Sequence, residues 1–126
     1  MSGNAEFGKR IRELREKKRD TDPSFSLRQF AAKVGISPTF LSKIENGDFD
    51  PPSAENIKKM AALLDCNADE LLALAGKVDP DISEIIRKKP KALADFLRVA
   101  NSRSEEEIRK MTARMVNPDE EDEDKQ

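Results

Sequence analysis

The sequence predicts an all-α protein, and three observations lead to this prediction. Apolar residues recur three and four positions apart along most of the chain, which is the period of an amphipathic helix. Residues that cap helix N-termini stand just before these apolar stretches. No stretch alternates apolar with polar residues as a half-buried strand does, and aromatic residues make up only 5% of the composition against 38% for charged residues. Small helical units with broad solvated faces fit this composition best.

Five helices are predicted in the first 76 residues. The first occupies residues 5–18, where Phe7, Ile11 and Leu14 share one face. Each of the next four follows a capping residue, and these caps are Ser26, Ser37, Ser53 and Asn67. The glycines that end the second, third and fifth helices are Gly35, Gly47 and Gly76.

Three more helices are predicted after the fifth. Asp79-Pro80 and Pro90 provide start signals, and Ser104 with Glu107 has the spacing of a capping box. These helices are too short to bury their apolar stripes by themselves. We therefore expect this segment to dock on the N-terminal helices or on a second subunit.

The charges are unevenly distributed along the chain. The net charge is −2, yet residues 1–47 carry ten Lys and Arg against six Asp and Glu. The last ten residues, NPDEEDEDKQ, hold six acidic residues and one Lys. Without this end the protein is mildly basic. We expect residues 117–126 to form a solvated, disordered acidic tail that aids solubility.

Cysteine content and hydropathy favour a cytoplasmic protein. Cys66 is the only cysteine, so the chain forms no internal disulfide, which fits a reducing compartment. We expect Cys66 to be a small core residue, with a redox sensor as the alternative. The N-terminus lacks the apolar region of a signal peptide, and no run approaches 18 apolar residues. We therefore expect no association with a membrane.

Two predicted helices, LRQFAAKV and PTFLSKIENG, meet across a short turn at residues 35–37. Ala31 is small at a position where the two helices must approach closely. Gly35 can adopt the left-handed conformation that reverses the chain without a Cβ clash. Ile36 can fill the corner between the helices. This arrangement predicts a helix-turn-helix.

The second helix of this motif has two distinct faces. Leu41 and Ile44 form its inward stripe. The outward residues are Thr39, Ser42, Lys43 and Asn46. Such a helix can lie in the major groove of double-stranded DNA with its N-terminal residues at base edges, while the preceding helix crosses the phosphate backbone.

The stretch SLRQFAAKVGISPTFLSKIENGDFDPPSAENIKKMAALLDCNADELL closely resembles the Cro/repressor-type helix-turn-helix family, often called the XRE family. With the first helix, the resemblance covers residues 5–75. It implies a five-helix repressor-type DNA-binding domain over residues 1–76, followed by a short C-terminal helical extension. We assign residues 77–116 to that extension, which would serve dimerisation or partner binding.

The resemblance also implies roles for particular residues. The positions that usually address bases are Pro38, Thr39 and Lys43, with Phe40 close by. Backbone contacts are common at the positions of Arg28, Ser37, Ser42 and Asn46. The family pattern pairs Arg15 of the first helix with Glu45 as a structural ion pair. Phe40 has two interpretations of equal weight: contact with a thymine methyl group, or packing sideways on the preceding helix.

The sequence departs from the family pattern in the connection between the first two helices. Roughly five extra residues lie around residues 19–23. A tolerated surface insertion is the first interpretation, because lengthening a loop costs little free energy. The alternative is that Lys17, Lys18 and Arg19 contact flanking phosphates. The turn of the helix-turn-helix is not affected in either case.

Nothing in the sequence points to catalysis. It contains no His, no Gly-rich phosphate loop and no metal-ligand spacing, so we expect no catalytic residue, no metal and no cofactor. The favoured function is a dimeric transcriptional repressor that reads a pseudo-palindromic operator. The alternative is an antitoxin-like or adaptor protein that binds a protein partner through residues 78–116, with DNA binding secondary.

Overall fold

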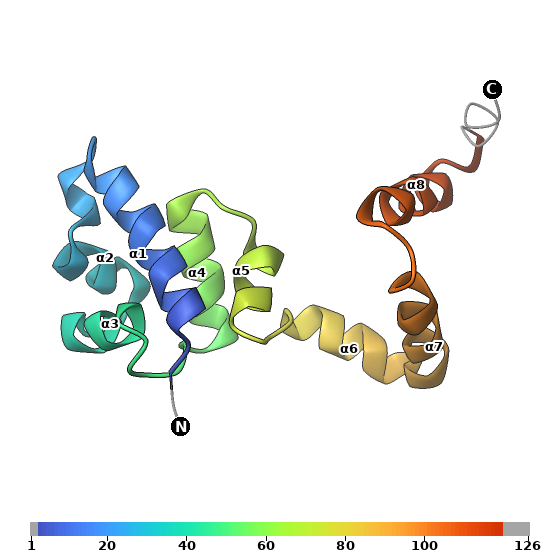
Figure 1. The fold of residues 1–126 in the computed structure, drawn as a ribbon, viewed down its shortest axis with the longest axis horizontal. Helices are drawn as coiled ribbons and strands as arrows, with labels where there is room; N and C mark the ends of the chain where they lie inside the picture. The colour runs from blue at the N-terminus through green and yellow to red at the C-terminus, as the bar shows by residue number, and fades with distance from the viewer. Residues whose placement is uncertain (1–2, 120–126) are drawn as a thin grey trace. The chain divides into compact units, whose positions relative to one another are not determined.

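The computed structural model describes residues 3–119, and within them all regular structure is helical (Figure 1). This confirms the predicted all-α class. The elements are α1 Ala5–Arg19, a 3-10 turn Pro23–Phe25, α2 Leu27–Val34, α3 Pro38–Glu45, α4 Ala54–Leu64, α5 Ala68–Leu74, α6 Pro80–Lys88, α7 Pro90–Ala100 and α8 Glu105–Val116. The helices α2 to α8 begin at the signals that predicted them, whereas the 3-10 turn at Pro23–Phe25 lies in a segment predicted as a loop.

The helix starts are fixed by local hydrogen bonds. The side chains of Ser26, Ser37, Ser53 and Asn67 each accept a hydrogen bond from the backbone N–H three residues later. At α8 the capping box is complete, because Glu107 also accepts from the N–H of Ser104 at 3.0 Å. These bonds satisfy N–H groups that the helices leave without an internal partner.

The hydrophobic core lies among the first five helices. Its fully buried side chains come from every helix of this group, and the largest are Phe7, Ile11, Phe30, Val34, Leu41, Ile44, Ile57, Met60 and Leu72. Burying each large side chain contributes about 1.5–3 kcal/mol. Figure 1 shows α2 and α3 side by side at one end of this group, where the core holds their inward faces. The core therefore fixes the orientation of the two helices of the motif.

Gly8 allows α1 to approach α3 closely. A Cβ atom at this position would overlap the backbone carbonyl oxygen of Ile44 and would lie 2.9 Å from that of Glu45. The first helix therefore rests directly on the last turn of α3. Asn4 links the start of α1 to the end of α5. Its side-chain oxygen caps α1, and its side-chain amide donates to the carbonyl of Leu74 at 2.9 Å.

The chain divides into two compact units, Met1–Ser83 and Glu84–Gln126. The division lies beyond residue 76 because Lys58 of α4 forms an ion pair with Asp79 at 3.1 Å, which ties the start of α6 to the first unit. The domain limits at residues 76 and 116 stay predictions. Residues 120–126 of the predicted acidic tail lie outside the described residues. In the part of the chain that the structure describes, no helix has the length and apolar character needed to cross a membrane.

Candidate nucleic-acid interface

The turn between α2 and α3 is built as the sequence predicts. Gly35 has φ 95°, in the left-handed region, and the N–H groups of Gly35 and Ile36 both donate to the carbonyl of Ala31, at 2.9 and 3.0 Å. Ala31 is fully buried, so the two helices meet closely there. Ser37 then accepts from the N–H of Phe40 at 3.0 Å, and α3 begins at Pro38. The direction in which α3 leaves the turn is therefore fixed by backbone hydrogen bonds.

The two faces of α3 differ sharply in burial. Leu41 and Ile44 are fully buried, whereas Thr39, Lys43 and Asn46 are exposed. A shallow depression of about 360 Å³ lies on this outward surface. Its lining consists of Leu27, Pro38, Thr39, Ser42, Lys43, Asn46 and Asp48. The structure thus brings five of the predicted DNA-contact residues together around one depression.

The other three predicted contact residues lie apart from this depression. Arg28 is exposed in the first turn of α2. The hydroxyl of Ser37 serves as the cap of α3. Phe40 is half-buried against the core, and its ring faces Phe49 of the following loop at a centroid distance of 6.0 Å. Its sideways packing thus involves that loop, which the sequence did not indicate.

The sequence of this part of the chain is similar to that of known proteins. The helix-turn-helix family model matches residues 11–71. Over these residues the chain is similar to helix-turn-helix proteins, the kind of motif that its sequence predicts.

Three relatives are similar in sequence to part of this chain. The uncharacterized HTH-type transcriptional regulator RghRB of Bacillus subtilis (strain 168) is 39% identical over 79 residues, which is 63% of this chain and 53% of that protein. The HTH-type transcriptional regulator SinR of the same organism is 29% identical over 87 residues, covering 64% of this chain and 74% of that protein. The HTH-type transcriptional repressor RghR, also of B. subtilis, is 34% identical over 58% of this chain and 50% of that protein. The match thus spans only about half the length of RghRB and RghR.

A solved SinR protein/SinI protein complex is similar over 77% of this chain and 99% of that chain. The sequence identity is 25% and the TM-score is 0.45.

A buried ion pair connects the helix-turn-helix to α1. Arg15 Nε and Glu45 Oε2 are 2.7 Å apart, and Arg15 Nη2 donates to Glu45 Oε1 at 2.9 Å. The two side chains are only 5% and 4% exposed. Arg15 also donates to the carbonyl of Phe25 at 3.2 Å. The hydrogen bonds to the Glu45 carboxylate raise the pKa of Arg15, so the guanidinium is charged at every accessible pH.

The longer connection between α1 and α2 packs onto the domain. Phe25 is buried, and the ammonium groups of Lys18 and Lys33 lie 5.3 and 4.4 Å from its ring centroid. Lys18 also forms an ion pair with Asp65. Asp22 caps the 3-10 turn, and the hydrogen bonds that it accepts from Ser24 lower its pKa. Of the three basic residues considered for phosphate contact here, Lys18 is therefore engaged within the domain.

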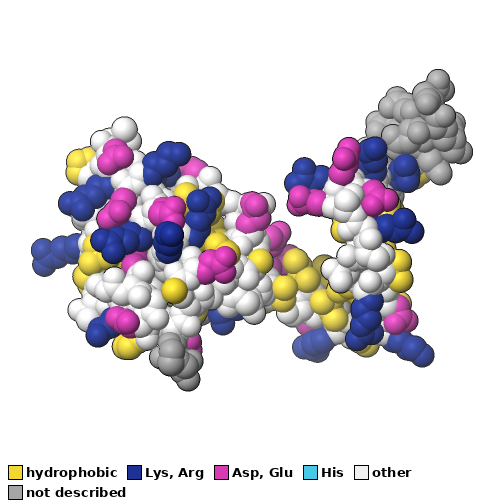
Figure 2. Space-filling view, viewed as in Figure 1, with side chains coloured by type: hydrophobic (Ala, Val, Ile, Leu, Met, Phe, Trp, Pro, Cys, Tyr) yellow, Lys and Arg dark blue, Asp and Glu magenta, His cyan; other side chains and the backbone are white. Residues whose placement is uncertain are grey.

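Figure 2 shows basic and acidic side chains interspersed over the visible face of the first unit. On this face the cations are therefore placed locally among acidic side chains and do not form a continuous basic surface. Three residues of structural importance near α3 had no role in the sequence prediction: Gly8, Asn4 and Phe49. Two of them carry a sequence signal: Asn4 is a capping residue directly before the first predicted helix, and Phe49 is an aromatic residue in the loop after α3.

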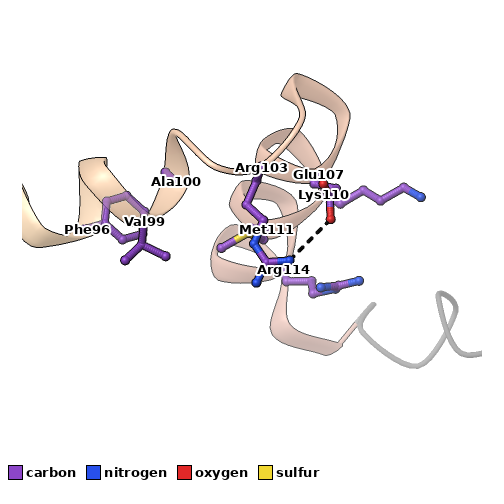
Figure 3. A pocket seen from close by; sticks show the side chains of 8 residues that line it. All are labelled: Phe96, Val99, Ala100, Arg103, Glu107, Lys110, Met111 and Arg114. Carbon is purple, nitrogen blue, oxygen red and sulfur yellow. Dashed lines mark ion pairs between the residues drawn. The ribbon is translucent and has the colours of Figure 1, made fainter.

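The second unit carries a groove between α7 and α8 (Figure 3). It measures about 580 Å³. Apolar side chains of both helices line it together with charged ones: Phe96, Val99, Ala100, Arg103, Glu107, Lys110, Met111 and Arg114. Arg103 and Glu107 form an ion pair at 3.7 Å, drawn as a dashed line. No residue of α6, α7 or α8 is buried, and Phe96 and Leu97 are about half exposed.

Proposed function

We propose that this chain is a sequence-specific DNA-binding transcriptional regulator, a dimeric repressor that reads a pseudo-palindromic operator with α3. The observation that carries the proposal is the division of α3 into a fully buried apolar face and an outward face around one depression. A helix held in this way can enter the major groove, which is about 12 Å wide. The names of the relatives, HTH-type transcriptional regulators and a repressor, support the same function.

The residues divide into two kinds of contact. Thr39 and Lys43 offer a hydroxyl and an ammonium group to base edges, and Pro38 offers an apolar surface to a thymine methyl group. The proposed backbone contacts come from Arg28, Ser37, Ser42 and Asn46. These would hold the phosphates and set the register of α3, whereas the base contacts supply specificity.

The three C-terminal helices support dimerisation through residues 78–116. They bury no residue within the described chain, and large apolar side chains such as Phe96 and Leu97 are half exposed. A second copy would cover these side chains and place two copies of α3 on half-sites about one helical turn apart. Such a regulator would act in the cytoplasm and would need no cofactor, metal or catalytic residue.

The first experiment selects bound sequences from a random DNA pool and then measures the affinity for the selected operator and for random DNA at fixed salt. Lys43→Ala is expected to lower the ratio of the two affinities by about 5- to 150-fold, since one good base contact contributes roughly 1–3 kcal/mol. The double variant with Thr39→Ala is expected to abolish the ratio. Lys59→Ala on α4 also removes an exposed cation and serves as the matched control. An unchanged ratio in the double variant would show that α3 is not the reading element.

A second candidate function is an antitoxin-like or adaptor protein that binds a protein partner. The groove between α7 and α8 favours it, because apolar side chains line it beside charged ones (Figure 3). Light scattering of the purified chain and co-expression with the product of the neighbouring gene separate the two functions. A stable dimer that binds operator DNA alone favours the repressor. A monomer that co-purifies with the neighbouring protein favours the adaptor.

A further inference from the structure

The loop after α3 is folded back onto the end of that helix. The N–H groups of Asp48 and Phe49 both donate to the carbonyl of Lys43, at 2.9 and 3.3 Å. Gly47 makes the reversal possible with φ 80°, and its own N–H donates to the carbonyl of Ile44 at 3.0 Å. The backbone of Phe49 is therefore fixed to the same residue that we propose as a base contact.

The Phe49 side chain contacts both Phe40 and Lys43. Its ring centroid is 6.0 Å from that of Phe40, with an angle of 51° between the ring planes. The Lys43 ammonium lies 5.7 Å from the Phe49 ring centroid, within the range of a cation–π interaction. Phe49 is nevertheless 44% exposed and lies outside the core, unlike the fully buried Phe7 and Phe30. Its position is better explained by the contact with Lys43 than by core stability.

We infer that Phe49 is a positioning residue for Lys43, and this inference rests on the proposed function. The negative face of the ring attracts the ammonium group and restricts a side chain that has many rotamers. The ring of Phe40, half-buried on α3, also packs against the Phe49 ring. Lys43 therefore meets the base with part of its conformational freedom already lost, so binding has less ordering to accomplish.

The ring also restricts the conformations that the Lys43 side chain can adopt. Asp48, an acidic residue, lines the same depression as Lys43. An ammonium drawn to that carboxylate is less available to a base. The aromatic face holds the charge without competing for its hydrogen bonds, because a ring accepts no strong hydrogen bond.

The test compares Phe49→Leu with Phe49→Tyr. Leucine keeps an apolar side chain and the backbone hydrogen bonds but has no aromatic face, whereas tyrosine keeps the face. An exposed cation–π contact corresponds to about a two- to five-fold change in equilibrium. Phe49→Leu is therefore expected to lower the ratio of operator to random-DNA affinity by that factor, and Phe49→Tyr to stay within twofold of the wild type. Equal urea midpoints of the two variants would establish that the fold is retained.

A double-mutant cycle separates positioning from direct DNA contact. On a Lys43→Ala background, Phe49→Leu is expected to cause no further loss, because the residue acts through Lys43. The same loss in both backgrounds would mean that the ring touches DNA itself, and it would overturn the inference. A wild-type ratio in Phe49→Leu would overturn it as well.

A readout without DNA distinguishes this inference from the proposed function. Protons above an aromatic face are shielded, so the ε-methylene protons of Lys43 are expected upfield in the free protein and to return to ordinary shifts in Phe49→Leu. Equal shifts in the two proteins would overturn the inference whatever the DNA result. The upfield shift could be present in a wild-type protein that does not discriminate between operator and random DNA. In that case the proposed function is wrong, and so is the positioning role of Phe49. The contact between Phe49 and Lys43 would still be established.

Discussion

Removing either partner of the Arg15–Glu45 pair is expected to destabilise the domain severely. Glu45→Ala leaves a buried guanidinium whose one remaining acceptor is the carbonyl of Phe25, at 3.2 Å. Arg15→Ala leaves a buried carboxylate and deprives the Phe25 carbonyl of its donor. An uncompensated charge in a poorly solvated site is the physical cause in both cases.

The magnitude follows from the geometry of the pair. Two charge-assisted hydrogen bonds of 2.7 and 2.9 Å join side chains that are about 95% inaccessible to solvent. Breaking such a pair from one side costs about 3–5 kcal/mol. A small domain has about 5–10 kcal/mol in total, so each single variant would lose a large part of its stability. Replacing both residues with apolar ones, Arg15→Met with Glu45→Leu, should recover most of this loss, because no charge is then left buried.

The assay is urea unfolding of the full chain, monitored by circular dichroism, for both single variants, for the double variant Arg15→Ala with Glu45→Ala, and for Arg15→Met with Glu45→Leu. Coupled partners must be non-additive, and we expect a coupling energy of about 2 kcal/mol or more. The control is the exposed pair Arg12–Glu16, which is 3.3 Å apart with side chains 54% and 51% exposed. Each single alanine variant of this control pair should lower the free energy of unfolding by less than about 0.5 kcal/mol.

Two results would refute this reasoning. Additive single effects would show that the partners do not depend on each other. Losses below about 1 kcal/mol for each single variant would place the pair in the same class as the exposed control. A further expectation concerns DNA: under conditions where Glu45→Ala is folded, its ratio of operator to random-DNA affinity should match the wild type, because the residue faces the core and not the outward surface.

Three further predictions concern salt, packing and pH. The logarithm of operator affinity should fall linearly with the logarithm of salt concentration, by about 0.9 per phosphate neutralised, and Arg28→Gln should reduce the slope by about one unit; equal slopes would exclude a phosphate contact there. Gly8→Ala should cost about 1–3 kcal/mol in urea melts because its Cβ would overlap the Ile44 carbonyl, and a more stable variant would contradict this close approach. Hydrogen bonds from the Asp81 backbone and from Lys58 lower the pKa of Asp79, so its stabilising contribution is present above the ordinary pKa of 3.8 and is lost as pH falls through the lower folded value. In Asp79→Asn, the urea midpoint should no longer fall with pH in this range to the extent that Asp79 causes. The same pH dependence of the urea midpoint in the variant and the wild type would contradict this role of Asp79.

The helix starts could be predicted because their causes are local. A capping side chain and the N–H that it satisfies are only three residues apart, as at Ser37 and Phe40. The apolar period likewise identifies the buried face of each helix without knowledge of its neighbours, which is why Leu41 and Ile44 were assigned correctly to the core. The turn at Gly35 depends on one residue that tolerates the left-handed conformation.

The candidate site was predictable only in part. Outward positions on α3 follow from the helical period, and the depression gathers five of the eight residues named for DNA contact. The period does not give the path of the loop after α3. The contact between Phe49 and Lys43 therefore depends on how the loop folds back, and sequence spacing alone did not indicate it.

The sequence by itself determined the all-α class, most of the helix starts, the two faces of α3 and the uneven charge. Only the tertiary structure decided which distant residues meet: Gly8 against Ile44, Arg15 with Glu45 at 2.7 Å, and Lys58 with Asp79 at 3.1 Å. The resemblance to a family suggested the second of these, but residue spacing did not. The physical reason is that caps and apolar periods act within one or two helical turns, whereas a contact between residues 20 to 40 positions apart depends on how whole helices pack around the core.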